Sequence, residues 1–219
     1  MIKINIKEWI RRDEFEAFNS FDNPCYTLTS RICVSNLLRL HNEQKYSFFI
    51  MYMYCINMAC NRNPSFLYRI IDNEVYCYDK INISAVIKNN SGKLVTVEIP
   101  CNYDFAVYYA NALNIINKAK KNNEKAFENN VANVIYVSCI PWISTTSMTH
   151  PLPSPNNKMS LSIPRFAWDK YIEDDGDWYV NMNICVNHAL VNGEELAKVF
   201  VDTQDEINKL SNVIGDERL

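Results

Sequence analysis

The residues from Asn183 to Phe200 read NICVNHALVNGEELAKVF and include one of the three histidines of the chain. A strand-like run ends at His188, and a helix is expected to begin directly after Asn192. Because strand side chains alternate between two faces, four apolar residues should share a face with this histidine, namely Val180, Met182, Ile184 and Val186. An imidazole at the edge of a buried face can stay neutral at pH 7, as a general base requires. A histidine that serves packing alone is the other interpretation of the pattern.

Three further groups could do chemistry, and each also has a simpler interpretation. His150 follows Ser147 by three residues and could face a substrate channel, although a histidine in a surface loop explains it as well. Cys139 lies in an apolar strand, where a thiol is usually inert. The carboxylates of EDDGD, residues 173–177, are sufficiently explained by a turn between two strands, so we expect no metal site.

The composition is that of an ordinary globular protein. Of 219 residues, 48% are hydrophobic and 21% charged, which suits a single domain spanning residues 1–219. A net charge of -3 and the lack of a basic cluster predict neither a nucleic acid nor a membrane as partner. The apolar stretch Tyr46–Cys60 is shorter than a membrane span needs, and we expect a buried core helix there.

The cysteines indicate a reducing compartment. There are eight, without a C-x-x-C pair and mostly among apolar neighbours, so we expect reduced thiols in a cytoplasmic protein. A disulfide framework, the alternative, usually belongs to a smaller secreted chain. The N-terminus lacks the apolar core of a signal peptide.

Helices and strands are expected to alternate along the chain. Helices are predicted in the apolar stretch, from 104 to about 129 and from 193 to about 210. The continuous apolar run NVIYVSCIPWIS predicts a central strand, and hairpins are expected with turns at Asp72-Asn73 and at EDDGD. The expected class is therefore α/β, with a mixed sheet flanked by helices.

Several segments resemble the chloramphenicol acetyltransferase family. HALVNGEELAKVF is similar to the family's signature H-H-x-x-x-D-G followed by a helix. VSCIPWISTTSM resembles its S-x-x-P-W-x-x-x-x-S-[FM] element, and EWIRRDEFEAF resembles its N-terminal tryptophan-arginine-phenylalanine segment. NPSFLYRIIDNEVYCYDKI and DKY also match in the same order, so the similarity spans nearly the full length.

The resemblance implies a two-layer CoA-dependent acyltransferase fold and a homotrimer with active sites between subunits. It implies acetyl transfer from acetyl-CoA to a hydroxyl of chloramphenicol, without an acyl-enzyme. His188 matches the general base, and Ser147 matches the serine that donates a hydrogen bond to the oxyanion. Arg11 matches an arginine that supports the site, and Lys170 matches a lysine near the CoA phosphate.

The sequence departs from the family pattern at the supporting pair and at the acceptor. Asn192 replaces an aspartate that pairs with the arginine in the family, so Arg11 is expected to find another carboxylate, such as Asp13, Glu194 or Glu195. Asn192 also suits a helix cap. Ala167 replaces a threonine that holds an active-site water, and Ala17 and Phe18 replace two aromatic residues of the acceptor pocket.

Two other functions stay open beside chloramphenicol acetylation. The altered pocket fits an acetyltransferase for another hydroxylated small molecule. Asn192 and Ala167 also fit a non-catalytic relative that binds a ligand or partner. An acyl-enzyme on Cys139 is the weakest alternative.

Overall fold

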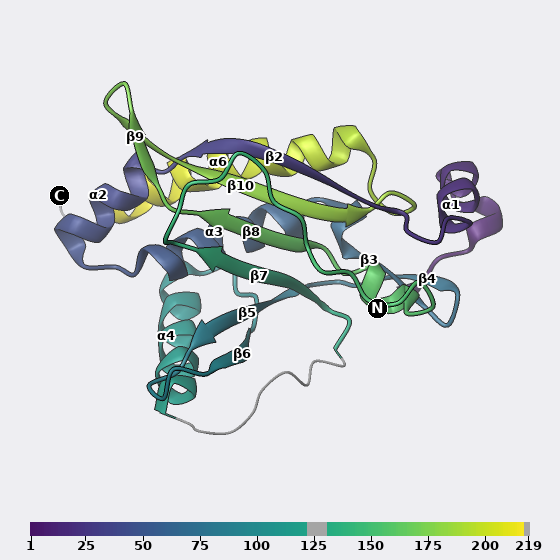
Figure 1. Cartoon of the computed structure of the whole chain (residues 1–219), viewed down its shortest axis with the longest axis horizontal. Helices are drawn as coiled ribbons and strands as arrows, with labels where there is room; N and C mark the ends of the chain where they lie inside the picture. The colour runs from purple at the N-terminus through teal and green to yellow at the C-terminus, as the bar shows by residue number, and fades with distance from the viewer. Residues whose placement is uncertain (122–130, 217–219) are drawn as a thin grey trace.

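A mixed sheet of seven strands runs through the molecule (Figure 1). The structure is a computed structural model that describes residues 1–121 and 131–216. The strand order is β2-β10-β8-β7-β5-β6, with β9 beside β10. The strands of this sheet are β2 (Cys25–Cys33), β5 (Asn82–Lys88), β6 (Leu94–Ile99), β7 (Val134–Ile140), β8 (Arg165–Asp169), β9 (Ile172–Asp174) and β10 (Asp177–Asn187). A small antiparallel sheet, in the order β1-β4-β3, contains β1 (Ile2–Lys3), β3 (Tyr68–Ile71) and β4 (Glu74–Cys77).

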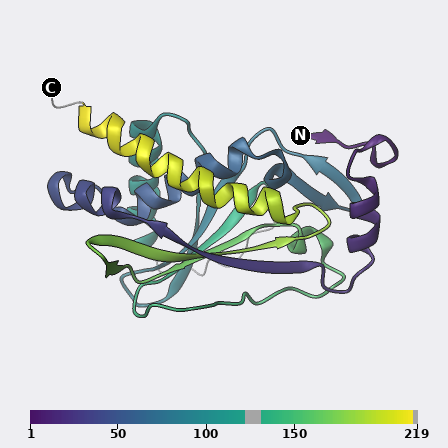
Figure 2. The ribbon, with the colours of Figure 1, turned by 90° about the horizontal axis from the view of Figure 1, so that it is seen from above.

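Helices cover one side of the large sheet, and the loop of residues 141–157 runs along the other (Figure 2). The predicted two-layer α/β architecture is therefore confirmed. The helices are α1 (Arg12–Asn19), α2 (Ser35–Gln44), α3 (Phe48–Arg62), α4 (Phe105–Lys121), α5 (Lys158–Leu161) and α6 (Gly193–Asp216), with 3₁₀ turns η1 (Ile6–Glu8) and η2 (Pro64–Leu67).

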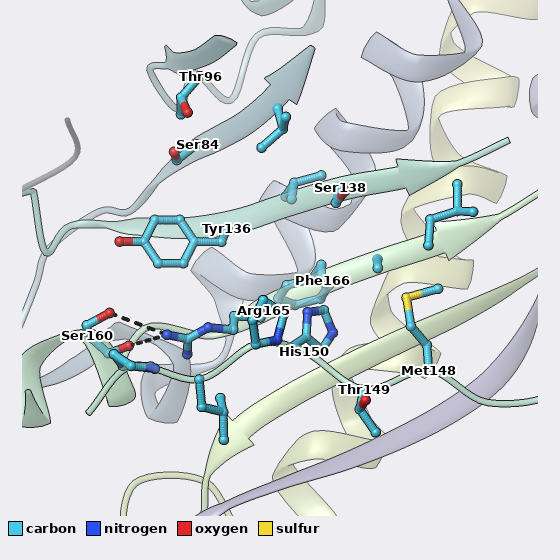
Figure 3. A pocket seen from close by; sticks show the side chains of 17 residues that line it. Ser84, Thr96, Tyr136, Ser138, Met148, Thr149, His150, Ser160, Arg165 and Phe166 are labelled. Carbon is cyan, nitrogen blue, oxygen red and sulfur yellow. Dashed lines mark hydrogen bonds between the residues drawn. The ribbon is translucent and has the colours of Figure 1, made fainter. Parts of the chain in front are cut away.

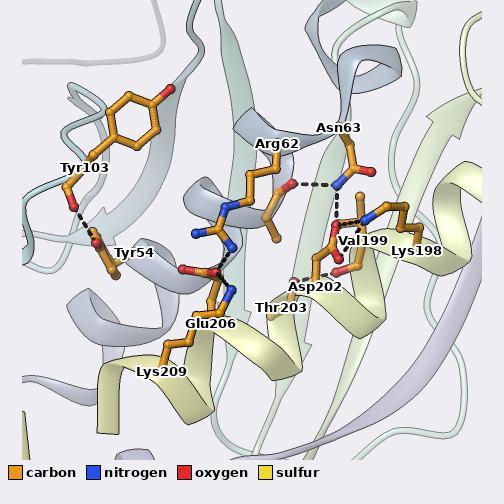
Figure 4. Close-up of polar contacts among 11 residues, drawn as sticks. Tyr54, Arg62, Asn63, Tyr103, Lys198, Val199, Asp202, Thr203, Glu206 and Lys209 are labelled. Atoms are coloured by element: carbon orange, nitrogen blue, oxygen red, sulfur yellow. Dashed lines mark hydrogen bonds and ion pairs between the residues drawn. The ribbon is translucent and has the colours of Figure 1, made fainter. Parts of the chain in front are cut away.

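Helix α3 is the predicted core helix. Every residue from Ile50 to Cys60 is buried, because the helix has neighbours on all sides. Tyr52 packs edge-on against Trp168 of β8, with ring centroids 4.9 Å apart. At its far end Arg62 forms an ion pair with Glu206 of α6 (Figure 4). These contacts place α3 between the sheet and α6.

The helix boundaries differ from the prediction in two places. Helix α6 begins at Gly193 as expected but continues to Asp216 rather than ending near Leu210. Ile214 is 4% exposed and extends the apolar stripe of the helix by another turn. Helix α4 is described as far as Lys121, and the remainder of its predicted range lies outside the described residues.

Both predicted hairpin turns are confirmed. Asp72 and Asn73 join β3 to β4 with φ angles of 51° and 63°. Asp175 and Gly176 join β9 to β10 with φ angles of 53° and 84°. Two successive residues with positive φ match the right-handed twist of the strands, and Asn, Asp and Gly tolerate that conformation best.

The central position predicted for β7 is confirmed, since it lies between β5 and β8 and is parallel to both. Strand β10 is antiparallel to β8. Strands β7 and β10 therefore run in opposite directions, and their C-terminal ends lie at opposite ends of the sheet. The loops that follow the two strands are separated for this reason.

The described residues offer neither a membrane span nor a metal cluster. No helix within 1–121 or 131–216 combines the length and apolar character needed to cross a bilayer. Within the same ranges no three His, Cys, Asp or Glu side chains gather to hold a metal ion.

Arg69 joins β3 to the chain that enters β7. Its side chain is fully buried, and burial lowers its pKa to about 10. The guanidinium donates to four backbone carbonyls at 2.7–2.9 Å, those of Phe66, Tyr68, Ala132 and Val134. Because each buried carbonyl needs a donor, this residue is expected to matter for stability.

We expect Arg69→Met to lower the free energy of unfolding by about 3 kcal/mol or more, because buried carbonyls lose their donors. Urea unfolding followed by circular dichroism measures the change. The control is Arg12→Met, because Arg12 pairs with Glu16 at the surface and its loss should cost far less than the loss of Arg69. Equal effects of the two substitutions would contradict the structural role of Arg69.

Candidate active site

His188 lies in the turn directly after β10, which ends at Asn187, one residue before the end at His188 that the sequence predicts. The predicted buried face is confirmed along the strand: four alternating residues are at most 1% exposed, namely Val180, Met182, Ile184 and Val186. The backbone N–H of His188 donates to the carbonyl of Pro24 at 2.9 Å. The residue before β2 therefore anchors the turn.

Aromatic rings hold the imidazole of His188. Phe18 of α1 stacks on it with ring centroids 3.8 Å apart, and Tyr26 of β2 lies 4.6 Å away. The ring is half-buried, and its Nδ1 is buried without a hydrogen-bond partner among the residues that the structure describes. This leaves Nε2 as the nitrogen through which the histidine can meet a substrate.

Glu195 connects Arg11 to the start of α6. Nη1 of Arg11 forms an ion pair with Oε2 of Glu195, and Nη2 lies 3.0 Å from Oε2 of Glu14. Oε2 of Glu195 also accepts from the backbone N–H of Asn192 at 2.8 Å. In return, Oδ1 of Asn192 accepts from the backbone N–H of Glu195 at 3.0 Å. This reciprocal pair is a capping box.

The structure therefore supplies the missing carboxylate from a different position. Of the three carboxylates expected as partners of Arg11, Glu195 takes that place, three residues after Asn192. Asn192 acts as the helix cap, which is its simpler predicted role, and Glu195 stands between it and Arg11.

Ser147 lies on the loop between β7 and α5, and its side chain is exposed. The loop is fixed to β10 on both sides of this serine. Nδ2 of Asn181 donates to the carbonyl of Thr145 at 2.9 Å. Nδ2 of Asn183 donates to the carbonyl of Met148 at 2.9 Å. These bonds hold Ser147 over the middle of β10.

Within one chain, Ser147 and His188 are far apart. Asn183, which binds the residue next to Ser147, precedes His188 by five positions. Five residues of extended strand span about 16 Å. A serine and a histidine that act on one reacting group must both lie within hydrogen-bond reach of it, so one chain does not bring these two together.

A cavity of about 600 Å³ opens on the loop side of the sheet (Figure 3). Ala167, which was expected in the acceptor pocket, lines it. Its polar lining comes from several strands and from the loop, and includes Ser84, Thr96, Tyr136, Ser138, His150 and Arg165. Its size suits a small-molecule ligand.

His150 lines this cavity, whereas the sequence suggested a surface histidine. Nε2 of His150 lies 2.8 Å from Oδ1 of Asn183, whose amide nitrogen donates elsewhere. Oδ1 must therefore accept, and Nε2 carries the proton. Burial is the main effect on His150 and lowers its pKa, so the ring is neutral at neutral pH. Its position three residues after Ser147 was the available signal.

Arg165 is a residue of this cavity that the sequence reasoning missed. It lines the cavity although it begins a strand whose other residues are mostly apolar. A charged side chain inside the run IPRFAW was the signal that could have identified it.

The other expected site residues lie outside this cavity. Ala17 is exposed on α1, and its neighbour Phe18 stacks on His188. Lys170 is exposed just after β8, where its backbone N–H donates to the carbonyl of Ile143 at 3.0 Å. In one chain, Ala17 and Phe18 are thus separate from Ala167.

Cys139 is a poor nucleophile in this structure. Burial raises the pKa of its thiol to about 12, and Asp169 acts in the same direction. The thiol therefore stays protonated at neutral pH, which does not favour an acyl-enzyme.

We expect Glu195→Ala to lower the free energy of unfolding by about 2–3 kcal/mol. The substitution removes half of the capping box and leaves the buried guanidinium of Arg11 without its main partner. Thermal and urea unfolding measure the loss. The matched control is Glu194→Ala, because Glu194 is exposed in the same helical turn and should cost about 0.5 kcal/mol or less. A loss no larger than that of the control would contradict the role of Glu195.

Comparison with known proteins links this geometry to one family. The family model described as chloramphenicol acetyltransferase matches residues 1–204. A chloramphenicol acetyltransferase from Proteus mirabilis is 22% identical over 212 residues, and the match covers 93% of each chain. One from Clostridium perfringens is 25% identical over 218 residues and 98% of each chain.

Solved structures agree in fold. A chloramphenicol acetyltransferase superposes with a TM-score of 0.86 and 26% identity, covering 93% of this chain and 98% of that one. A dihydrolipoamide acetyltransferase from Azotobacter vinelandii has a TM-score of 0.66 at 13% identity over 92% of this chain and 88% of that one, and shares the fold. The chain described here belongs to the chloramphenicol acetyltransferase family, as the motifs in its sequence predicted.

Proposed function

We propose that this chain, as a single domain of residues 1–219, transfers an acetyl group from acetyl-CoA to a hydroxyl of chloramphenicol. Membership of the family and the names of its relatives support this activity. The observation that carries the proposal is the half-buried imidazole of His188, which aromatic rings hold at the edge of the sheet.

His188 is the proposed general base. Its Nε2 accepts the proton of the acceptor hydroxyl while the oxygen attacks the thioester carbonyl. The tetrahedral intermediate then collapses, the bond from carbon to sulfur breaks, and the CoA thiolate takes the proton from His188. A positioned base of this kind contributes about 10²–10⁴-fold to the rate.

Ser147 is the proposed oxyanion donor. Its hydroxyl is exposed on an anchored loop, where it can point toward a partner molecule. One such donor is typically worth about 3–4 kcal/mol of transition-state stabilisation.

Within one chain the proposed base His188 and the proposed oxyanion donor Ser147 are about 16 Å apart. A homotrimer with active sites between subunits would let both residues act on the same thioester. In such an assembly Ser147 of one subunit faces His188 of another. Trp142 and Ile143 support a subunit contact beside this loop, because they are 75% and 57% exposed. The same assembly would join Phe18, beside His188, to the cavity that Ala167 lines in the neighbouring subunit.

Lys170 is the proposed contact to a CoA phosphate, since its side chain is exposed just after β8. The eight cysteines are all unpaired, which supports a reducing cytoplasmic location.

Asn192 fits an active enzyme. In the Azotobacter vinelandii dihydrolipoamide acetyltransferase, the catalytic mechanism has been investigated at a serine, a histidine and an asparagine four residues after that histidine. His188 and Asn192 have the same spacing. This favours catalysis over the non-catalytic alternative, while Ala167 leaves a different hydroxylated acceptor as the second candidate.

Two inactive variants should complement each other if the site is shared. We expect His188→Ala to reduce thiol release from acetyl-CoA and chloramphenicol by about 10²–10⁴-fold, and Ser147→Ala by about 10²–10³-fold. Co-expression of the two should restore about a quarter of the sites, because random mixing leaves that share of interfaces with both groups intact. Native mass spectrometry confirms that mixed oligomers form. Mixed oligomers as inactive as their parents would exclude a shared site.

We expect Asn192→Asp to lower activity by about fivefold, since the new carboxylate lies beside Glu195 and repels it by roughly 1 kcal/mol. The double variant Asn192→Asp with Glu195→Gln returns the negative charge to position 192 and should recover most of the activity. Steady-state kinetics of both variants test this, and a gain of activity in the single variant would show that Glu195 has not replaced the family's aspartate.

A further inference from the structure

Arg165 is a buried cation in the wall of the large cavity (Figure 3). Arg165 lines the cavity and is only 7% exposed. Nη1 donates to the carbonyl of Ile163 at 2.9 Å, and Nη2 donates to the carbonyl of Ser160 at 2.8 Å. Both acceptors are neutral, so these bonds satisfy N–H groups without balancing the charge.

No carboxylate neutralises Arg165 within the described ranges of the chain. Arg165 takes part in none of the ion pairs among the described residues. None of the described residues that line the cavity is acidic. Glu98 lies on the same row of the sheet but three strands away, about 14 Å. Asp169 lies four residues along β8, and its carboxylate accepts from Asn181 and Thr145.

Two other arginines are buried in the described residues: Arg11, which carboxylates neutralise, and Arg69, whose guanidinium has a purely structural role. Arg69 is fully buried, and four carbonyls surround it. Arg165 differs because one side of it borders an open volume of about 600 Å³. An uncompensated charge at such a wall is expensive unless a counter-charge enters the cavity.

In the described register the strand partners of Arg165 are Tyr136 of β7 and Cys185 of β10, a phenol and a thiol. Interaction with the Cys25 thiol is the main cause that lowers the pKa of Cys185. Cys185 does not line the cavity, so a thiolate there would share the guanidinium with a ligand rather than replace it.

The rest of the lining suits an apolar body attached to the anionic group. The Tyr136 ring lies 5.6 Å from Cζ of Arg165 and borders the cavity together with Phe166, Leu152 and Pro151. A planar guanidinium matches the two oxygens of a carboxylate better than a single point charge would.

We infer that this cavity binds hydroxylated molecules through a carboxylate held by Arg165, so that carboxylate-bearing alcohols are a further class of acetyl acceptor. The acceptor part of this inference rests on the proposed acetyl transfer, whereas the binding part does not.

The test uses two matched alcohols, 4-(hydroxymethyl)benzoate and its neutral analogue 4-(hydroxymethyl)benzamide. Calorimetry on the full chain without acetyl-CoA measures binding, and thiol release with acetyl-CoA measures transfer. We expect the benzoate to bind about 10- to 100-fold more tightly than the benzamide, and kcat/KM to follow the same order. Arg165→Met should bring the ratio of the two affinities close to one, and Arg165→Lys should keep part of the preference.

Arg31→Met is the matched control. Arg31 also lies over a tyrosine ring, that of Tyr179 at 4.2 Å, but it pairs with Asp174 away from the cavity. This variant should keep the wild-type preference. Equal binding of the two alcohols by the wild-type chain overturns the inference even if no Arg165 variant folds, and so does a preference that survives Arg165→Met.

The two proposals fail in different ways. Turnover of chloramphenicol with no preference for the benzoate leaves acetyl transfer standing and overturns the carboxylate site. Binding of the benzoate that depends on Arg165, with no turnover of any alcohol, supports the carboxylate site and overturns acetyl transfer.

Discussion

Strand β10 pairs with neighbouring strands on both sides, and this pairing determines on which face of the sheet its polar side chains lie. Strand β2 pairs with β10 from Tyr179 to Asn187, and β8 pairs with it from Met182 to Cys185. Its even-numbered side chains face the helices and the odd-numbered ones face the loop. A shift of one residue in the pairing would exchange the helix-facing and the loop-facing side chains. The register therefore determines the position of the histidine after the strand and of the asparagines that bind the loop.

The same strand arrangement separates the two proposed catalytic groups, Ser147 and His188, within one chain. Strand β7 leads to Ser147 and β10 leads to His188, and the two strands run in opposite directions. The distance between the groups is therefore set by the sheet, and no rotation of a side chain can remove it. The proposed mechanism therefore depends on an association of subunits that brings the base and the oxyanion donor to one thioester.

The support behind the histidine shows how a fold can keep an interaction while the sequence position changes. An arginine buried beside the start of a helix needs a carboxylate nearby, but the first turn of a helix offers more than one position for it. Here Asn192 caps the helix and Glu195 supplies the charge, and the two are joined by reciprocal hydrogen bonds. The cap and the counter-charge, which a single aspartate could combine, are divided between two side chains.

The sequence by itself determined the family, the α/β class, the core helix, both hairpin turns and the apolar face of β10, because these follow from periodicity, turn chemistry and local motifs. It also identified Glu195 among three candidate partners of Arg11, but it could not choose among them, since the choice depends on how α1 lies against the start of α6. Only the tertiary structure decided that His150 and Arg165 face one cavity, because they come from a loop and a strand that meet through the packing of the sheet. The separation of Ser147 from His188 likewise depends on strand order and direction, which long-range pairing sets and local sequence does not encode.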